Sequence, residues 1–185
     1  EASRAGILGA FDWVAHTATD PNDAVVIYWS GHGSWAPDLD GDEAQLDPLD
    51  KDDEALVPWD ARDIHDPQQL VLDDDIRRFL EKLETRNVTV IVDACYSGTV
   101  TRGAGPRARG PLPPPNGGRG RLDMVDSPNN HVLFTAASAN QTSYEIRFGA
   151  DSTTAFGVFT YFFTEAMDRA DTSARADELY HDVLE

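Results

Sequence analysis

Two side chains with nucleophilic or acid–base chemistry each follow a short apolar segment of this sequence. Cys95, the chain's only cysteine, comes soon after the β-branched run 88–92, and His32 comes soon after the apolar run 24–29. An apolar run of this kind, without alternation, is typical of a strand buried on both faces of a parallel sheet. Open parallel sheets usually place binding and catalytic groups at the carboxyl ends of such strands. If these two strands are neighbours, the thiol and the imidazole leave the same edge, which is the minimum for an activated thiolate nucleophile.

Each of these residues also has an ordinary structural interpretation. A lone cysteine after a strand is more often a small buried apolar side chain than a nucleophile, and a lone histidine is more often a structural or surface residue. Here both occur beside glycine, in the segments Ser30-Gly31-His32-Gly33 and Asp93-Ala94-Cys95-Tyr96-Ser97-Gly98. The pattern alone therefore leaves a Cys–His dyad and two structural residues about equally open.

The same two segments resemble the histidine and cysteine motifs of the caspase-like cysteine peptidases, family C14. Residues 56–60 (Leu-Val-Pro-Trp-Asp) and 72–75 (Leu-Asp-Asp-Asp) are similar to the metacaspase and bacterial orthocaspase branch. The segments that resemble the small-subunit half of that family are 131–138, Gln141, Glu145 and 157–161. The resemblance extends from about residue 5 to residue 183. It implies a caspase-like three-layer α/β/α sandwich.

Extended and helical segments alternate along the chain, which independently predicts an α/β sandwich with a mostly parallel central sheet. Strands are expected at 24–29, 88–92 and 131–136, where the sequence is apolar. Apolar residues recur at helical spacing over 2–18, 73–84, 153–168 and 176–184. The aromatic-rich helix at 153–168 should be heavily buried. At the start of the helix at 73–84, Asp73 is expected as the N-cap.

The length of 185 residues suits one domain with a sizeable core. We expect a single peptidase domain over 1–185, with a large-subunit-like part at 1–100 and a small-subunit-like part at 123–185. Between them, residues 101–122 are dominated by Gly, Pro and Arg, a composition that cannot bury a core and predicts a flexible loop. In the family an earlier strand precedes the first helix, so we expect this sequence to be a core that lacks its N-terminal strand.

The resemblance implies a role for each candidate residue. Cys95 would attack the scissile carbonyl, and His32 would activate the thiol or protonate the leaving amine. The backbone amides of Gly33 and Cys95 would stabilise the oxyanion. Residues matching Asp93 and Ser30 line the S1 pocket in the family, and a carboxylate there favours Arg or Lys before the scissile bond. The alternative for Asp93 is a carboxylate at a strand end that is bonded to loop amides.

Carboxylates are dense in the segment 34–54. Alternating acids can surround a hard cation such as Ca²⁺, and a solvated acidic loop explains the same pattern. The resemblance implies calcium binding by Asp53, Asp73 and Asp74. Arg102 stands where the family has a further acid, seven residues after Cys95. Ca²⁺ is therefore an open expectation, and the thiol chemistry itself requires no cofactor.

The formal net charge of −18 argues against nucleic acid and against anionic membrane surfaces as partners. It favours cationic ligands, including peptide and protein substrates that carry Arg or Lys. A single cysteine argues against a disulfide-stapled secreted scaffold, and no secretory signal pattern is evident at the start. We expect a cytoplasmic protein, and the sequence does not predict its oligomeric state.

Together these features predict a caspase-like cysteine endopeptidase that cleaves after Arg or Lys. Self-processing is a further hypothesis, against the alternatives of an inert spacer or a basic arm. The candidate processing sites in the 102–121 loop are Arg102, Arg107, Arg109, Arg119 and Arg121. Two other functions remain open: a catalytically silent caspase-like scaffold or interaction domain, and a calcium-binding regulatory domain.

Overall fold

The part of the chain that the structure describes contains both helices and strands, as the sequence predicts. The computed structural model describes residues 1–41, 52–94, 107–108, 131–136, 143–147, 155–171 and 173–184. The elements are, in order, α1 (Arg4–Thr17), β1 (Ala24–Ser30), β2 (Gly33–Pro37), β3 (Asp52–Leu56), β4 (Val71–Leu72), α3 (Asp73–Glu81), β5 (Asn87–Asp93), β6 (Arg107–Ala108), β7 (His131–Thr135), β8 (Tyr144–Ile146), β9 (Phe156–Gly157), α4 (Val158–Arg169) and α5 (Ala176–Leu184).

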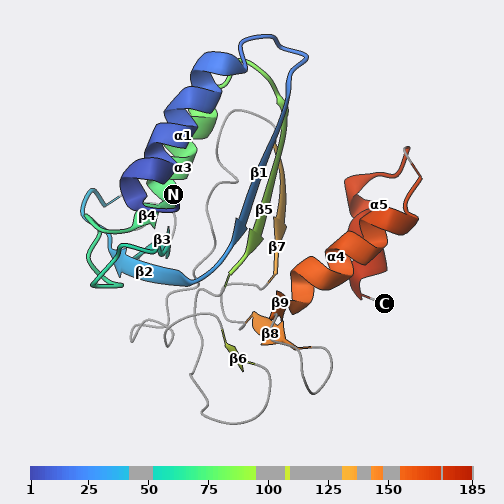
Figure 1. Cartoon of the computed structure of the whole chain (residues 1–185). Helices are drawn as coiled ribbons and strands as arrows, with labels where there is room; N and C mark the ends of the chain where they lie inside the picture. The colour runs from blue at the N-terminus through green and yellow to red at the C-terminus, as the bar shows by residue number, and fades with distance from the viewer. Residues whose placement is uncertain are drawn as a thin grey trace.

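The main sheet contains three parallel strands in the order β1-β5-β7. Helices α1 and α3 cover one face of this sheet, and α4 and α5 lie on the opposite face (Figure 1). The predicted caspase-like α/β/α architecture with a parallel central sheet is therefore confirmed. The register between β1 and β5 runs from Ala24 opposite Asn87 to Ser30 opposite Asp93.

The larger core lies between the sheet and the pair α1 and α3. Because side chains alternate along a strand, Val88, Val90 and Val92 point to this face, where all three are buried. Phe11 of α1 stacks on Phe79 of α3 with 4.6 Å between ring centroids. The predicted helices at 2–18 and 73–84 are confirmed, and each is slightly shorter than expected.

The core on the opposite face is smaller. Ile91, Phe134 and Phe163 are buried there, and Phe159 packs against them. The expectation of a heavily buried helix over 153–168 is wrong, because α4 begins only at Val158 and its outer side faces solvent. Only one stripe of a helix can contact a sheet, and so aromatic residues off that stripe remain exposed.

A second sheet, antiparallel in the order β2-β3-β4, follows the carboxyl end of β1. The expectation of an acidic loop over 34–54 is therefore wrong at both of its ends, which form β2 and β3; residues 42–51 lie outside the described part. Acidic residues are rare in strands, but pairing of β3 with both neighbours overrides that preference here. A third small sheet, β6-β8-β9, is also antiparallel.

Helix α3 differs from prediction at its first residue. The N-cap is Leu72, so the expectation that Asp73 caps this helix is wrong. The Leu72 amide donates instead to the Asp75 carboxylate, at 3.4 Å. Among the helices in the described ranges, none is both long and apolar enough to cross a membrane.

Candidate active site

The carboxyl ends of β1 and β5 meet at one edge of the main sheet. Ser30 and Asp93 are the last pair in their register, and the Gly31 amide donates to the Asp93 carbonyl at 3.2 Å, which extends the contact by one residue. His32 follows Ser30 by two residues, and Cys95 follows Asp93 by two residues. Cys95 lies outside the described residues, which reach Ala94. The His32–Cys95 dyad therefore stays a prediction.

The backbone around His32 is held from both sides. Before it, Gly31 bonds to β5; after it, Gly33 begins β2 and pairs with Leu56. The His32 carbonyl itself accepts the Val57 amide at 3.0 Å. The His32 side chain is exposed while Gly33 is buried. The sheet thus presents an imidazole to solvent on a short, fixed turn between two strands.

Asp93, at the end of β5, is fully buried with a relative exposure of 0%. The Ser143 hydroxyl donates to its Oδ1 at 2.8 Å, and the Thr160 amide donates to its Oδ2 at 3.2 Å. The Thr160 hydroxyl also donates to Oδ2. Thr160 lies in the first turn of α4, where backbone amides have no partner within the helix and a negative charge is favoured. A carboxylate from the central strand therefore caps a helix from the other half of the chain.

The approach of α4 to Asp93 requires glycine at its N-cap. A Cβ added at Gly157 would lie 1.8 Å from Asp93 Oδ2 and 2.7 Å from its Cγ. The Thr160 hydroxyl also lies 2.8 Å from the hydroxyl of Tyr28 in β1. Tyr28, Thr160, Asp93 and Ser143 form one polar network that joins β1, β5 and the start of α4.

Sequence reasoning did not find the partners of Asp93. A carboxylate at the end of a buried strand must be hydrogen-bonded, so the need for donors was foreseeable. Their identity was not, because Ser143 and Thr160 lie 50 and 67 residues further along the chain. Asp93 is therefore a hydrogen-bonded carboxylate at a strand end, as the second interpretation expects. Its donors are two hydroxyl groups and an amide of α4, and not amides of a loop.

The two residues expected in the S1 pocket differ in exposure. Ser30 is exposed and Asp93 is buried, although they are register partners whose side chains share one face of the sheet. The pairing brings the two positions together at the sheet edge.

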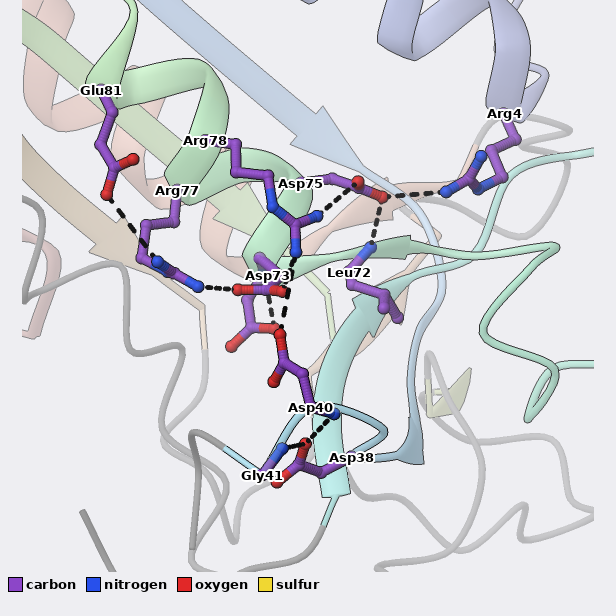
Figure 2. Close-up of polar contacts among 11 residues, drawn as sticks. Arg4, Asp38, Asp40, Gly41, Leu72, Asp73, Asp75, Arg77, Arg78 and Glu81 are labelled. Carbon is purple, nitrogen blue, oxygen red and sulfur yellow. Dashed lines mark hydrogen bonds and ion pairs between the residues drawn. The ribbon is translucent and has the colours of Figure 1, made fainter. Parts of the chain in front are cut away.

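The three acids expected to bind calcium lie on adjacent elements. Asp53 in β3 and both Asp73 and Asp74 in α3 are buried. The Asp74 carboxylate is bonded through one oxygen to Arg77 and through the other to Arg78. Figure 2 shows these arginines reaching toward the acids at the start of α3. In the parts of the chain that the structure describes, no three His, Cys, Asp or Glu side chains are grouped as a metal site.

Of the five arginines proposed as processing sites, only Arg107 falls in the described residues. It belongs to the short strand β6 and lies opposite Glu145 of β8. The others, outside the described ranges, are Arg102, Arg109, Arg119 and Arg121.

The sequence of this chain matches a known protein family. The sequence profile of the family described as "Metacaspase, peptidase C14 domain" matches residues 1–102, more than half of the chain. The chain belongs to this metacaspase family. The matched region contains β1, β5 and both candidate catalytic positions, so the family assignment rests on the same segments as the site.

Similar metacaspases come from several fungi. Metacaspase-1 of Ajellomyces capsulatus is 36% identical over 101 residues, which are 54% of this chain and 26% of that protein. Metacaspase-1A of Aspergillus niger is 37% identical over 101 residues, 54% of this chain and 22% of that protein. Metacaspase-1 of Cryptococcus neoformans is 36% identical over 99 residues, 52% of this chain and 20% of that protein. The match spans about a quarter or less of these relatives.

Proposed function

We propose that this chain is a cysteine endopeptidase in which Cys95 is the nucleophile and His32 its acid–base partner. One observation carries the proposal: β1 and β5 are parallel neighbours, and Ser30 lies opposite Asp93. The two candidate residues each stand two positions beyond that pair. Membership of a peptidase family supports the same chemistry.

In the proposed reaction, the Cys95 sulfur attacks the carbonyl carbon of the scissile peptide bond. The thiol proton passes to His32, which donates a proton to the leaving amine as the carbon–nitrogen bond breaks. Water then hydrolyses the thioester and regenerates the thiol. Backbone amides of Gly33 and Cys95 would stabilise the oxyanion. The turn around His32 supports this role, because backbone hydrogen bonds on both sides of His32 fix the main chain that carries the imidazole.

The proposed substrates are proteins and peptides with Arg or Lys before the scissile bond. Support comes from Asp93, a carboxylate two positions before Cys95 on the strand that ends at the site. Ser30, exposed beside it, is proposed as a polar contact of the same pocket. Because Asp93 is fully buried, its charge is proposed to act on a substrate cation from the floor of an S1 pocket.

The test compares fluorogenic peptides that end in Arg, Lys or Asp, with wild type, Cys95→Ala, His32→Ala and Asp93→Asn. The proposal expects cleavage of the Arg and Lys peptides, its loss in both dyad variants, and a reduced preference in Asp93→Asn. A folded wild type that cleaves none of the peptides would support a silent scaffold domain instead. Cleavage that persists in Cys95→Ala would exclude Cys95 as the nucleophile.

Self-processing within the 102–121 loop belongs to the same proposal. Terminal sequencing of aged wild-type protein should find new ends after Arg102, Arg107, Arg109, Arg119 or Arg121. Cys95→Ala purified in the same way should remain intact. A Cys95→Ala sample that is cut at the same positions would assign the cleavage to another protease.

A further inference from the structure

The acids at the start of α3 are unusually buried for a charged cluster. Asp73 and Asp74 have relative exposures of 5% and 8%, and Asp52, Asp53 and Glu54 of the adjacent β3 are also buried. Carboxylates withdrawn from water need hydrogen-bond donors or a counter-charge, because an uncompensated buried charge is strongly destabilising. The structure therefore has to supply donors or positive charge here.

At Asp74 and Asp75, arginines of this chain supply the positive charge. Arg77 bonds to one oxygen of Asp74, and Arg78 bonds to the other. Arg78 also reaches Asp75 at 3.4 Å and Asp40 at 4.0 Å, so that one guanidinium bridges the α3 acids to the segment after β2 (Figure 2). Arg78 thus shares its guanidinium among three carboxylates, a contact that the several donors of this group allow.

A third arginine completes the arrangement from α1. Arg4 contacts Asp75 at 3.1 Å, and its Nε donates to the Leu70 carbonyl at 2.5 Å. Its backbone amide donates to Asp60 at 3.0 Å. Asp74 and Asp75 are thus linked through these arginines to the rest of α3, to α1 and to the segment after β2.

The arginine contacts of Asp74 conflict with a calcium site in which Asp74 would bind the ion together with Asp53 and Asp73. Ca²⁺ requires six to eight oxygen ligands, chiefly carboxylates. Both oxygens of Asp74 face guanidinium groups, and a divalent cation would have to displace two arginines and then remain beside their charge. The residues present do not fit that ion while Arg77 and Arg78 hold these positions.

We propose that Arg77 and Arg78 take the place of a divalent cation as fixed counter-ions of the α3 acids, so that the folded chain does not bind calcium at this cluster. The proposal is independent of the peptidase function, because it concerns binding and stability. It predicts that the acids become a cation site only when the arginines are removed.

The test is thermal unfolding of the whole chain in EGTA and in 5 mM Ca²⁺, with calorimetric titration of Ca²⁺. The variant Arg77→Gln/Arg78→Gln is compared with Arg62→Gln/Arg86→Gln, which makes the same change in net charge at two exposed arginines. A site with a Kd of about 50 µM would raise the melting temperature by roughly 5–10 °C under these conditions. Wild type and the control pair should shift by less than about 2 °C, the scatter expected without a site.

In EGTA, the Arg77→Gln/Arg78→Gln variant should have a lower melting temperature than the control variant. In 5 mM Ca²⁺, it should regain at least part of that difference in melting temperature. If the double variant does not fold, Arg78→Gln replaces it in the same comparison. Stoichiometric Ca²⁺ binding by wild type that Asp74→Asn abolishes would overturn the proposal. So would an Arg77/Arg78 variant that is as stable as the control, or one whose lost stability calcium does not restore. None of these outcomes depends on peptide cleavage.

Discussion

Replacing Gly157 with alanine tests whether Asp93 couples the central sheet to α4. The backbone there has φ −63° and ψ 132°, which any residue adopts, so the substitution introduces no backbone strain. The added Cβ would instead lie 1.8 Å from Asp93 Oδ2. Ordinary carbon contacts are about 3.5–4 Å, and either the carboxylate or the start of α4 must therefore move by more than about 1 Å.

The movement breaks the hydrogen bonds that Asp93 accepts from Thr160 and strains the one from Ser143. Hydrogen bonds to a charged group contribute about 1.5–3 kcal/mol each and are not additive, which gives a loss of about 3–5 kcal/mol. The entropic benefit of replacing glycine offsets less than about 1 kcal/mol of this. For a chain of this size the melting temperature should fall by roughly 6–20 °C. Differential scanning calorimetry measures the change.

Gly9→Ala is the matched control, because nothing lies within 4 Å of its added Cβ in the exposed part of α1. It should raise the melting temperature by about 2–4 °C through helix propensity. A double-mutant cycle with Asp93→Ala adds a second check: in that background Gly157→Ala should cost little, since the clash is gone. If Gly157→Ala melts within about 2 °C of wild type, or is fully additive with Asp93→Ala, the coupling described here is refuted.

Three further predictions concern packing, the Asp93 network and pH. Phe79→Ala empties a site that is 2% exposed and should cost about 3–5 kcal/mol in urea unfolding, while Phe162→Ala, at 47% exposure, should cost far less; equal costs would contradict the core assignment. Thr160→Val removes the hydroxyl between Tyr28 and Asp93 and should cost about 1–2 kcal/mol, against a smaller loss for Thr164→Val, whose hydroxyl bonds only to carbonyls of its own helix. The Lys82 ammonium lowers the pKa of Asp12 below 3.8, so this pair stabilises the fold above that pH and the contribution disappears as the pH falls through the lowered value. Lys82→Gln should therefore lower the melting temperature slightly at pH 6, and the effect should disappear once the pH lies below the lowered pKa of Asp12; an equal effect above and below that pKa would exclude the ion pair as the cause.

Local patterns in the sequence predicted the main sheet and its helices. The β-branched run ending at Val92 is buried because the parallel sheet has helices on both faces. Strands buried on both faces have apolar residues at consecutive positions, and this pattern can be recognised in the sequence. The amphipathic pattern of the residues in α1 and α3 was likewise sufficient to predict these two helices. The pairing of β1 with β5 was a condition of the dyad hypothesis, and the structure shows the two strands as parallel neighbours.

Features that depend on distant contacts could not be predicted. Nothing local marks Thr160 as the partner of Asp93, or Gly157 as the residue that makes room for it. The aromatic run of α4 indicated burial on all sides, yet its helix packs through one stripe. The acidic residues around Asp53 have low strand propensity, so the sequence favours a loop there. Their place in β3 depends on pairing with β2 and β4, which the sequence does not reveal.

The pairing of β7 with β5 has a consequence for any protease cut between residues 95 and 130. The two resulting pieces would stay associated, since β7 is hydrogen-bonded along β5 from Val88 to Val92 and Asp93 holds the start of α4. Ile91, Phe134 and Phe163 form a shared apolar interface. A nicked sample should show two bands in a denaturing gel and yet migrate as one species in size-exclusion chromatography, as a heterodimer that separates only on unfolding.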